Sequence, residues 1–161
     1  MLHRFQDGGD GASPNSGLTL GAPGVIYGTA GAGGGQEDGV VFRLTRKKDG
    51  HCAEHVVHAF TDNAHGRGPS GPVTFDSAGN LYGPAGWGRY FAGVVYRLAP
   101  KAHGDSWEYS LPYEFKGAPD AAYPAARLVF DTAGNLYSTT QGGGSGQACQ
   151  GGCGTVFEID P

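Results

Sequence analysis

The residues best suited to chemistry are carboxylates and aromatic rings in glycine-rich segments between short apolar stretches. One set follows phenylalanines and consists of Asp7, Asp10, Asp62, His65 and Asp120, and a second set consists of Trp87, Arg89 and Tyr90. Carboxylates accept hydrogen bonds from hydroxyl groups, and an exposed aromatic ring offers a flat apolar surface. These residues predict a binding site for a carbohydrate, another polar ligand or a protein, although ordinary exposed turns have a similar composition.

Paired carboxylates would also allow a different chemistry. A glycoside hydrolase or lyase needs two of them about 5–10 Å apart across a pocket. The sequence contains no Gly-x-Ser-x-Gly element and no compelling arrangement of serine, histidine and aspartate. The glycine run at 31–35 lacks the lysine and hydroxyl residue of a phosphate loop. We therefore assign no catalytic residue and expect no cofactor.

Three cysteines raise the questions of metal binding and disulfide formation. Cys149 and Cys153 lie four positions apart, without the further cysteine or histidine ligands of a structural zinc site. A disulfide that closes this segment is the preferred interpretation, and two free thiols are the alternative. Cys52 is unpaired and is interpreted as a buried packing residue rather than a nucleophile.

Two nine-residue stretches, FDSAGNLYG at 75–83 and FDTAGNLYS at 130–138, are nearly identical and lie 55 positions apart. In each, an aspartate precedes a glycine by three positions, which is typical of a tight hairpin whose carboxylate accepts backbone N–H groups. The residues assigned to these turns are Asp76, Gly79, Asn80, Asp131, Gly134 and Asn135. A calcium loop is the alternative, but one carboxylate per copy is too few for the ion's oxygen shell.

The 55-residue spacing extends along the whole chain and reveals three repeats. Columns of identical residues are Phe5, Phe60 and Phe115; Pro14, Pro69 and Pro124; Gly24, Gly79 and Gly134; and Tyr27, Tyr82 and Tyr137. His3, His58 and Tyr113 form another column, which favours packing over catalysis. The sequence thus predicts a single repeat domain over 1–161, with repeats at 6–60, 61–115 and 116–161.

Each repeat contains four short apolar stretches that predict β-strands. The clearest are the third, at 40–44, 94–98 and 155–159, in which apolar and polar residues alternate. Four-stranded antiparallel units at such a period predict an all-β, β-propeller-like fold with three blades. The third repeat lacks its outer strand. Residues 1–5 are predicted to be the outer strand of a blade whose other strands come from the C-terminus or from another chain.

Three blades are few for a ring, because propellers usually have four to eight. Two chains could close a six-bladed ring by self-association about a two-fold axis. A fragment of a longer array and an isolated body of three blades are the alternatives.

Charge and hydropathy exclude several classes of partner. The net charge is −4, and the one basic cluster, Arg46-Lys47-Lys48, fits a solvated turn better than a nucleic-acid surface. No apolar stretch reaches the length of a membrane-spanning helix. The first ten residues do not resemble a signal peptide, because acidic residues interrupt them.

The combination of GNLY, GTVF at 154–157, FDTAGNLYSTTQGGG and DSWEYSLPYEF resembles the GloVer tandem-repeat proteins of bacteria. The resemblance covers essentially the whole chain in three copies. It implies a propeller-like β-repeat fold and an extracellular or cell-surface location, with no established chemistry and no catalytic residues to transfer. Members usually carry more repeats and an export signal, and a tryptophan matched here by Trp107 is replaced by Cys52 in the first copy.

Together these features predict a non-enzymatic binding or interaction propeller of an exported bacterial protein. The competing predictions are a glycoside hydrolase or lyase that uses paired carboxylates in the loops between the strands, and a purely structural repeat array.

Overall fold

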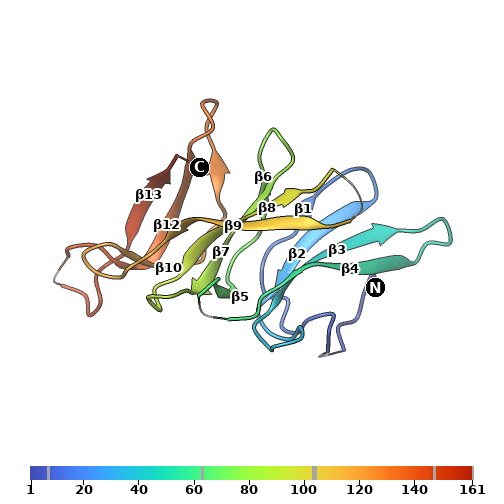
Figure 1. The fold of residues 1–161 in the computed structure, drawn as a ribbon, viewed down its shortest axis with the longest axis horizontal. Helices are drawn as coiled ribbons and strands as arrows, with labels where there is room; N and C mark the ends of the chain where they lie inside the picture. Colours follow the sequence, from blue (N-terminus) through green and yellow to red (C-terminus); the bar gives the residue numbers. More distant parts are fainter. Residues whose placement is uncertain (7, 63, 103–104, 147, 161) are drawn as a thin grey trace.

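The computed structural model describes residues 1–6, 8–62, 64–102, 105–146 and 148–160. Across these residues the chain is all-β, with no helix, and its strands form three antiparallel sheets. The sheets follow one another along the chain, as Figure 1 shows by its colour sequence from blue to red. The predicted all-β class and the three-unit organisation agree with this arrangement, and none of the sheets closes on itself.

The first sheet is a simple meander in the order β1-β2-β3-β4. Its strands are β1 (Thr19–Leu20), β2 (Val25–Ala30), β3 (Val40–Arg46) and β4 (Cys52–Ala59). A β-bulge between Val41 and Phe42 shifts the register of β3 against β4.

The second and third sheets repeat this order, with the first strand divided into two short pieces. The second sheet contains β5 (Arg67–Pro69), β6 (Thr74–Phe75), β7 (Leu81–Trp87), β8 (Val94–Pro100) and β9 (Trp107–Glu114). The third contains β10 (Ala121–Pro124), β11 (Val129–Phe130), β12 (Leu136–Gly143) and β13 (Thr155–Ile159). Both pieces pair with the same neighbour, β7 or β12, and no fourth strand follows β13 within the described residues.

Strands β5 and β10 are absent from the sequence-based prediction. Their segments are rich in glycine, alanine and proline, which are disfavoured in strands, and they end at Pro69 and Pro124, which have no N–H to donate. Residues 1–5, predicted as an outer strand, form no strand in this chain by itself.

The sheets pack face to face, and each contact between two neighbouring sheets is called a joint below. At the first joint, Tyr27 of β2 meets Phe75 of β6 edge to face, with 5.1 Å between ring centroids. At the second, Tyr82 of β7 meets Phe130 of β11 in the same way at 5.2 Å. The apolar core therefore consists mainly of two layers, one per joint.

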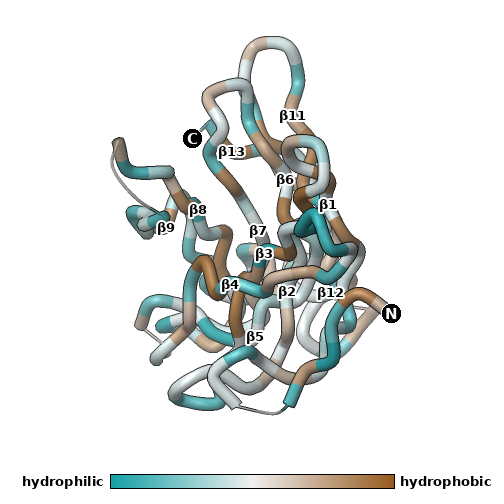
Figure 2. Tube along the Cα trace, turned by 90° about the vertical axis from the view of Figure 1, so that its right-hand side faces the viewer, coloured by the Kyte–Doolittle hydropathy of each residue, from teal (hydrophilic) through white to brown (hydrophobic). Residues whose placement is uncertain are grey.

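A second aromatic contact also recurs at each joint. Phe60 follows β4 and packs on Tyr96 of β8, and Phe115 follows β9 and packs on Phe157 of β13. Each phenylalanine thus ties the end of one sheet to the third strand of the next. In Figure 2 the apolar residues, in brown, lie mainly along the strands, where these layers form.

Hydrogen bonds near the first strands link the three sheets further. The hydroxyl of Thr19 donates to the carbonyl of Val73, and that of Thr74 donates to the carbonyl of Leu128 at 2.8 Å. Arg127 of the third repeat donates to the carbonyl of Leu18 in the first at 3.2 Å. The segments around these first strands therefore converge.

Candidate ligand site between the first two sheets

Arg67 and Trp87 form the centre of a polar cluster at the first joint. They are cross-strand partners of β5 and β7, and the guanidinium carbon lies 5.4 Å from the centroid of the indole ring. This geometry is a cation–π contact. Arg67 Nη1 also donates to Asp38 Oδ1 at 3.3 Å, so the guanidinium is held between a ring and a carboxylate. The indole stays 43% exposed.

A hollow of about 140 Å³ opens beside this pair. Its lining residues come from the β2–β3 connection and from β5 and β7: Gly31, Glu37, Asp38, Arg67, Gly68 and Trp87. The backbone N–H of Gly68 donates to the carbonyl of Asp38 at 2.8 Å, which fixes the β2–β3 connection against β5. Gly68 has a φ of +61°, and a Cβ there would approach the indole to 3.3 Å, so glycine suits this position on both counts.

The Arg67–Trp87 pair is particular to the second repeat. The equivalent cross-strand pair is Ala12 with Ala32 in the first repeat and Ala122 with Gly142 in the third. Small residues therefore satisfy the backbone pairing at this position. The large, polar pair is not required by the repeat and points to a separate role.

The arrangement suits the binding of a hydroxyl-rich molecule. The indole offers an apolar surface, and the carboxylates of Glu37 and Asp38 accept hydrogen bonds. Arg67 Nε is buried and has no hydrogen-bond partner among the described residues. The charges of Arg67 and Asp38 offset each other and Glu37 adds a negative charge, so the hollow disfavours an anionic ligand.

Sequence reasoning identified only Trp87 of this cluster. Arg67 was missed because its partner lies twenty positions away and only the β5–β7 register brings the two together. The signal available in the sequence was that Arg67 interrupts a repeat column otherwise occupied by Ala12 and Ala122.

Asp62 and His65 pair with each other instead of lining the hollow. His65 Nδ1 lies 2.9 Å from Asp62 Oδ1, and the His65 backbone N–H donates to the same oxygen at 2.8 Å. These hydrogen bonds lower the pKa of Asp62. The hydroxyl of Tyr109 donates to the His65 carbonyl and anchors this segment to β9.

Asp10 and Asp120 occupy equivalent positions and make equivalent turns. Asp10 accepts from the backbone N–H of Gln6 at 3.1 Å and lies 3.3 Å from His3 Nε2. Asp120 accepts from the backbone N–H of Lys116 at 2.9 Å and from the hydroxyl of Tyr113 at 3.2 Å. The two carboxylates hold local turns rather than facing the hollow. Asp7 lies outside the described residues.

Arg89 and Tyr90 lie away from Trp87 in a different hollow. Their neighbours there are Leu111, Pro112, Tyr113, Glu114 and Lys116 at the end of β9 and beyond. The predicted cluster of Trp87, Arg89 and Tyr90 is thus divided between two places.

The repeated hairpins place their aspartates in turns. Asp76 Oδ1 accepts from the backbone N–H groups of Ala78 and Asn80 at 2.9 and 2.8 Å, and Oδ2 accepts from the Asn80 side chain at 2.6 Å. Asp131 makes the same contacts with Ala133 and Asn135. Gly79 and Gly134 have φ values of +85° and +100°.

These hairpins, together with Asp160, line a hollow of about 550 Å³. Burial acts to raise the pKa of Asp131, but hydrogen bonds from Asn135, Ala133 and Tyr137 outweigh it and leave the pKa below its ordinary value. Both turn carboxylates are occupied by their own hairpins, which makes them poor general acids.

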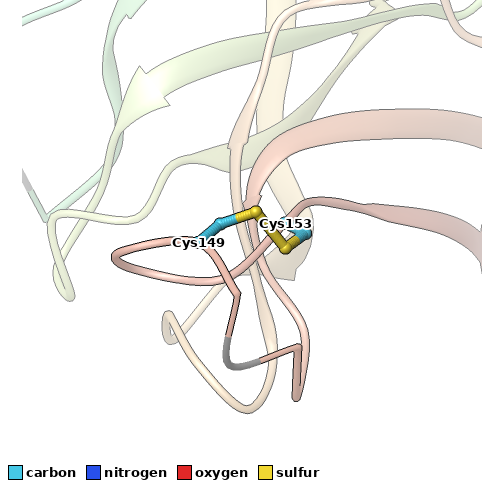
Figure 3. The surroundings of a disulfide bond; sticks show 2 residues. All are labelled: Cys149 and Cys153. Atoms are coloured by element: carbon cyan, nitrogen blue, oxygen red, sulfur yellow. A yellow bond between two sulfur atoms is a disulfide. The ribbon is translucent and has the colours of Figure 1, made fainter.

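A disulfide joins Cys149 and Cys153, as predicted, and closes the β12–β13 connection (Figure 3). Their Cα atoms are 5.2 Å apart. Within the described residues, no three histidine, cysteine, aspartate or glutamate side chains are grouped so as to hold a metal ion. Nor does that part of the chain contain a helix with the length and apolar character needed to span a membrane.

Comparison with known proteins places these repeats in a family. No curated protein matches the chain. The family model described as the Gloeobacter/Verrucomicrobia repeat, a description that points to bacterial repeat proteins, matches residues 1–161. The chain therefore belongs to the Gloeobacter/Verrucomicrobia repeat family.

Proposed function

We propose that this protein is a non-enzymatic binding module whose ligand is a neutral, hydroxyl-rich molecule of the carbohydrate class. The ligand contacts the hollow between the first two sheets, where Trp87 supplies the stacking surface and Glu37, Asp38 and Arg67 supply polar contacts. The observation that carries this proposal is the Arg67–Trp87 pair at a position where both other repeats have small residues.

The position of the hollow supports the same function. It is built from the β2–β3 connection and from β5 and β7 of the next sheet, along the lower edge of Figure 1. Connections that a rigid β-scaffold holds in place commonly carry binding residues. The hydrogen bond between Gly68 and Asp38 gives this connection a defined position before a ligand arrives.

The proposal also includes the wider setting of the chain. We place the three sheets as blades of a propeller-like assembly, in which further blades cover the two outer faces, and we place the protein outside the cytoplasm. The recurring joints support the blade arrangement, and the Cys149–Cys153 disulfide is consistent with an oxidising compartment.

The test is a glycan array of neutral and anionic oligosaccharides, followed by titration calorimetry with any sugar that binds. Trp87→Ala is expected to weaken binding by about two- to twelvefold, because a lost stacking contact is worth ~0.5–1.5 kcal/mol. Arg67→Lys keeps the charge but loses the planar stack, so its affinity should fall between those of the wild type and Trp87→Ala.

Tyr90→Ala is the matched control, because Tyr90 is about as exposed as Trp87 and lies in the adjacent β7–β8 connection but outside the hollow. Its affinity should equal that of the wild type. Equal weakening by Tyr90→Ala would show that the ligand binds elsewhere. An array on which the protein binds no oligosaccharide would contradict a carbohydrate ligand.

A further inference from the structure

The two outer sheets each present one face without a neighbouring sheet. The face of the first sheet that points away from the second is called the leading face and carries Leu18, Leu20, Leu44 and Cys52. The face of the third sheet that points away from the second is called the trailing face and carries Val129, Tyr137, Val156 and Glu158. Each residue has counterparts, about 55 positions away, that lie inside a joint.

Burial at these equivalent positions identifies both faces as joint surfaces without a partner. Val73 and Leu128 are fully buried in the two joints, whereas their leading-face counterpart Leu18 is 54% exposed. On the other side, Val41 and Val95 are fully buried, whereas Val156 is 81% exposed. The side chains at these positions are apolar in all three sheets, although no other sheet of the chain covers Leu18 or Val156.

The shape of the leading face fits the trailing-face tyrosine. At the first joint, Tyr27 packs against Phe75 and Trp107. The counterparts of these two residues on the leading face are the smaller Leu20 and Cys52, which with Leu44 and Arg46 line an apolar hollow of about 250 Å³. Tyr137, the counterpart of Tyr27, would fill this space.

The charges at the two faces are reversed relative to the first joint. There, Arg43 of β3 donates to both carboxylate oxygens of Asp105 in the β8–β9 connection, at 3.1 and 3.2 Å. The counterpart of Arg43 on the trailing face is Glu158. The counterpart of the β8–β9 connection is the end of β3 with the β3–β4 hairpin, which together carry Arg46, Lys47 and Lys48 and one acidic residue, Asp49. The two open faces are thus complementary to each other.

The first residues of the chain occupy a position that matches this pairing. Phe60 and Phe115 follow the fourth strands of their sheets and pack on the third strand of the next sheet. Phe5 packs in the same way on Phe42 of β3, with 5.0 Å between ring centroids. Residues 1–5 therefore lie where the fourth strand of a preceding sheet would end. Among the described residues, β13 is the third strand that has no fourth strand beside it.

We propose that a second copy of this chain docks its trailing face on the leading face, and that two such joints close a ring of six sheets about a two-fold axis. Tyr137 of each copy enters the hollow beside Cys52 of the other, and Glu158 faces the basic hairpin. This inference rests on the blade arrangement included in the proposed function and is independent of the ligand site.

The test is the solution mass of the purified chain by sedimentation velocity across a range of concentrations. The wild type should have twice the mass of the 16.6 kDa chain. Val156→Arg should be a folded monomer, because an exposed side chain can be replaced without loss of the monomer's own packing. Glu158→Lys should dissociate more readily than the wild type, and adding Lys47→Glu and Lys48→Glu should restore the dimer. Tyr90→Arg, at an exposed position away from both faces, should stay dimeric.

A wild type that is monomeric at all concentrations would overturn the proposal and favour further repeats of a longer protein as the cover. Masses that grow beyond the dimer would overturn the closed ring, because they indicate open head-to-tail assembly. A dimer that Val156→Arg leaves intact would place the interface elsewhere. The Trp87→Ala variant should keep the wild-type mass, so a failure of ligand binding and a failure of ring closure are separate results.

Discussion

His58 shows how a single residue in this repeat takes on a packing role. Its ring stacks on Tyr109 with 4.4 Å between centroids and an interplanar angle of 8°, and it meets Phe60 edge to face. Tyr113 and His3, in the same repeat column, make the corresponding edge contacts with Phe115 and Phe5. Burial, with a smaller contribution from the charge of His65, lowers the pKa of His58 to about 4.

The lowered pKa predicts an acid-sensitive stability. His58 binds a proton at the ordinary pKa of 6.5 in the unfolded chain but only near 4 in the folded chain. The free energy of unfolding is therefore highest, as far as His58 determines it, above pH 6.5, and it decreases as the pH falls toward 4. The upper bound on the loss is on the order of 3 kcal/mol. His58→Tyr, which copies Tyr113 of the second repeat, should flatten this part of the profile.

Urea unfolding of wild type and variant between pH 4 and 8 measures this difference. His51→Tyr, in the exposed β3–β4 hairpin, is the control and should keep the wild-type slope. A His58→Tyr profile that parallels the wild type would show that the acid sensitivity comes from other groups.

At the scale of elements, the β6–β7 and β11–β12 hairpins each depend on one carboxylate, Asp76 and Asp131. Asp131→Ala removes the acceptor of two backbone N–H groups and one side-chain amide, and the expected loss of stability is ~1–3 kcal/mol. Thr132→Ala, in the same turn, removes a side chain that makes no hydrogen bond within the described residues and should change stability by less than about 0.5 kcal/mol. Thermal and urea unfolding measure both; equal effects would contradict the role of the carboxylate.

The sequence predicts the elements well where alternation and repeat spacing act together. The third strands were expected at 40–44, 94–98 and 155–159, and the structure extends the first two by two residues each and matches the third. In contrast, β5 and β10 exist because β7 and β12 offer long edges to pair with, and the local sequence gives no strand signal there. The ligand site could not be predicted for the same reason, because Arg67 belongs to β5 and meets Trp87 only through the pairing of β5 with β7.

At the scale of the whole molecule, stability should decrease from the middle sheet outward. The middle sheet is covered on both faces, and Val94, Val95, Tyr96 and Leu98 of β8 are all fully buried. β13 is covered on one face only and forms the edge of its sheet. In stacked repeat proteins each unit contacts only its neighbours, so an end unit can open while the others stay folded.

Hydrogen exchange measured by mass spectrometry tests this gradient and links it to assembly. In the Val156→Arg monomer, amides of β13 should exchange much faster than those of β8, because no partner covers the trailing face. In the wild-type dimer, β13 should gain protection from the second copy while β8 changes little, since both of its faces are already buried within one chain. Equal exchange of β8 and β13 in the monomer would mean that the three sheets open as one cooperative unit, so that the joints, rather than the individual sheets, determine the stability of the chain.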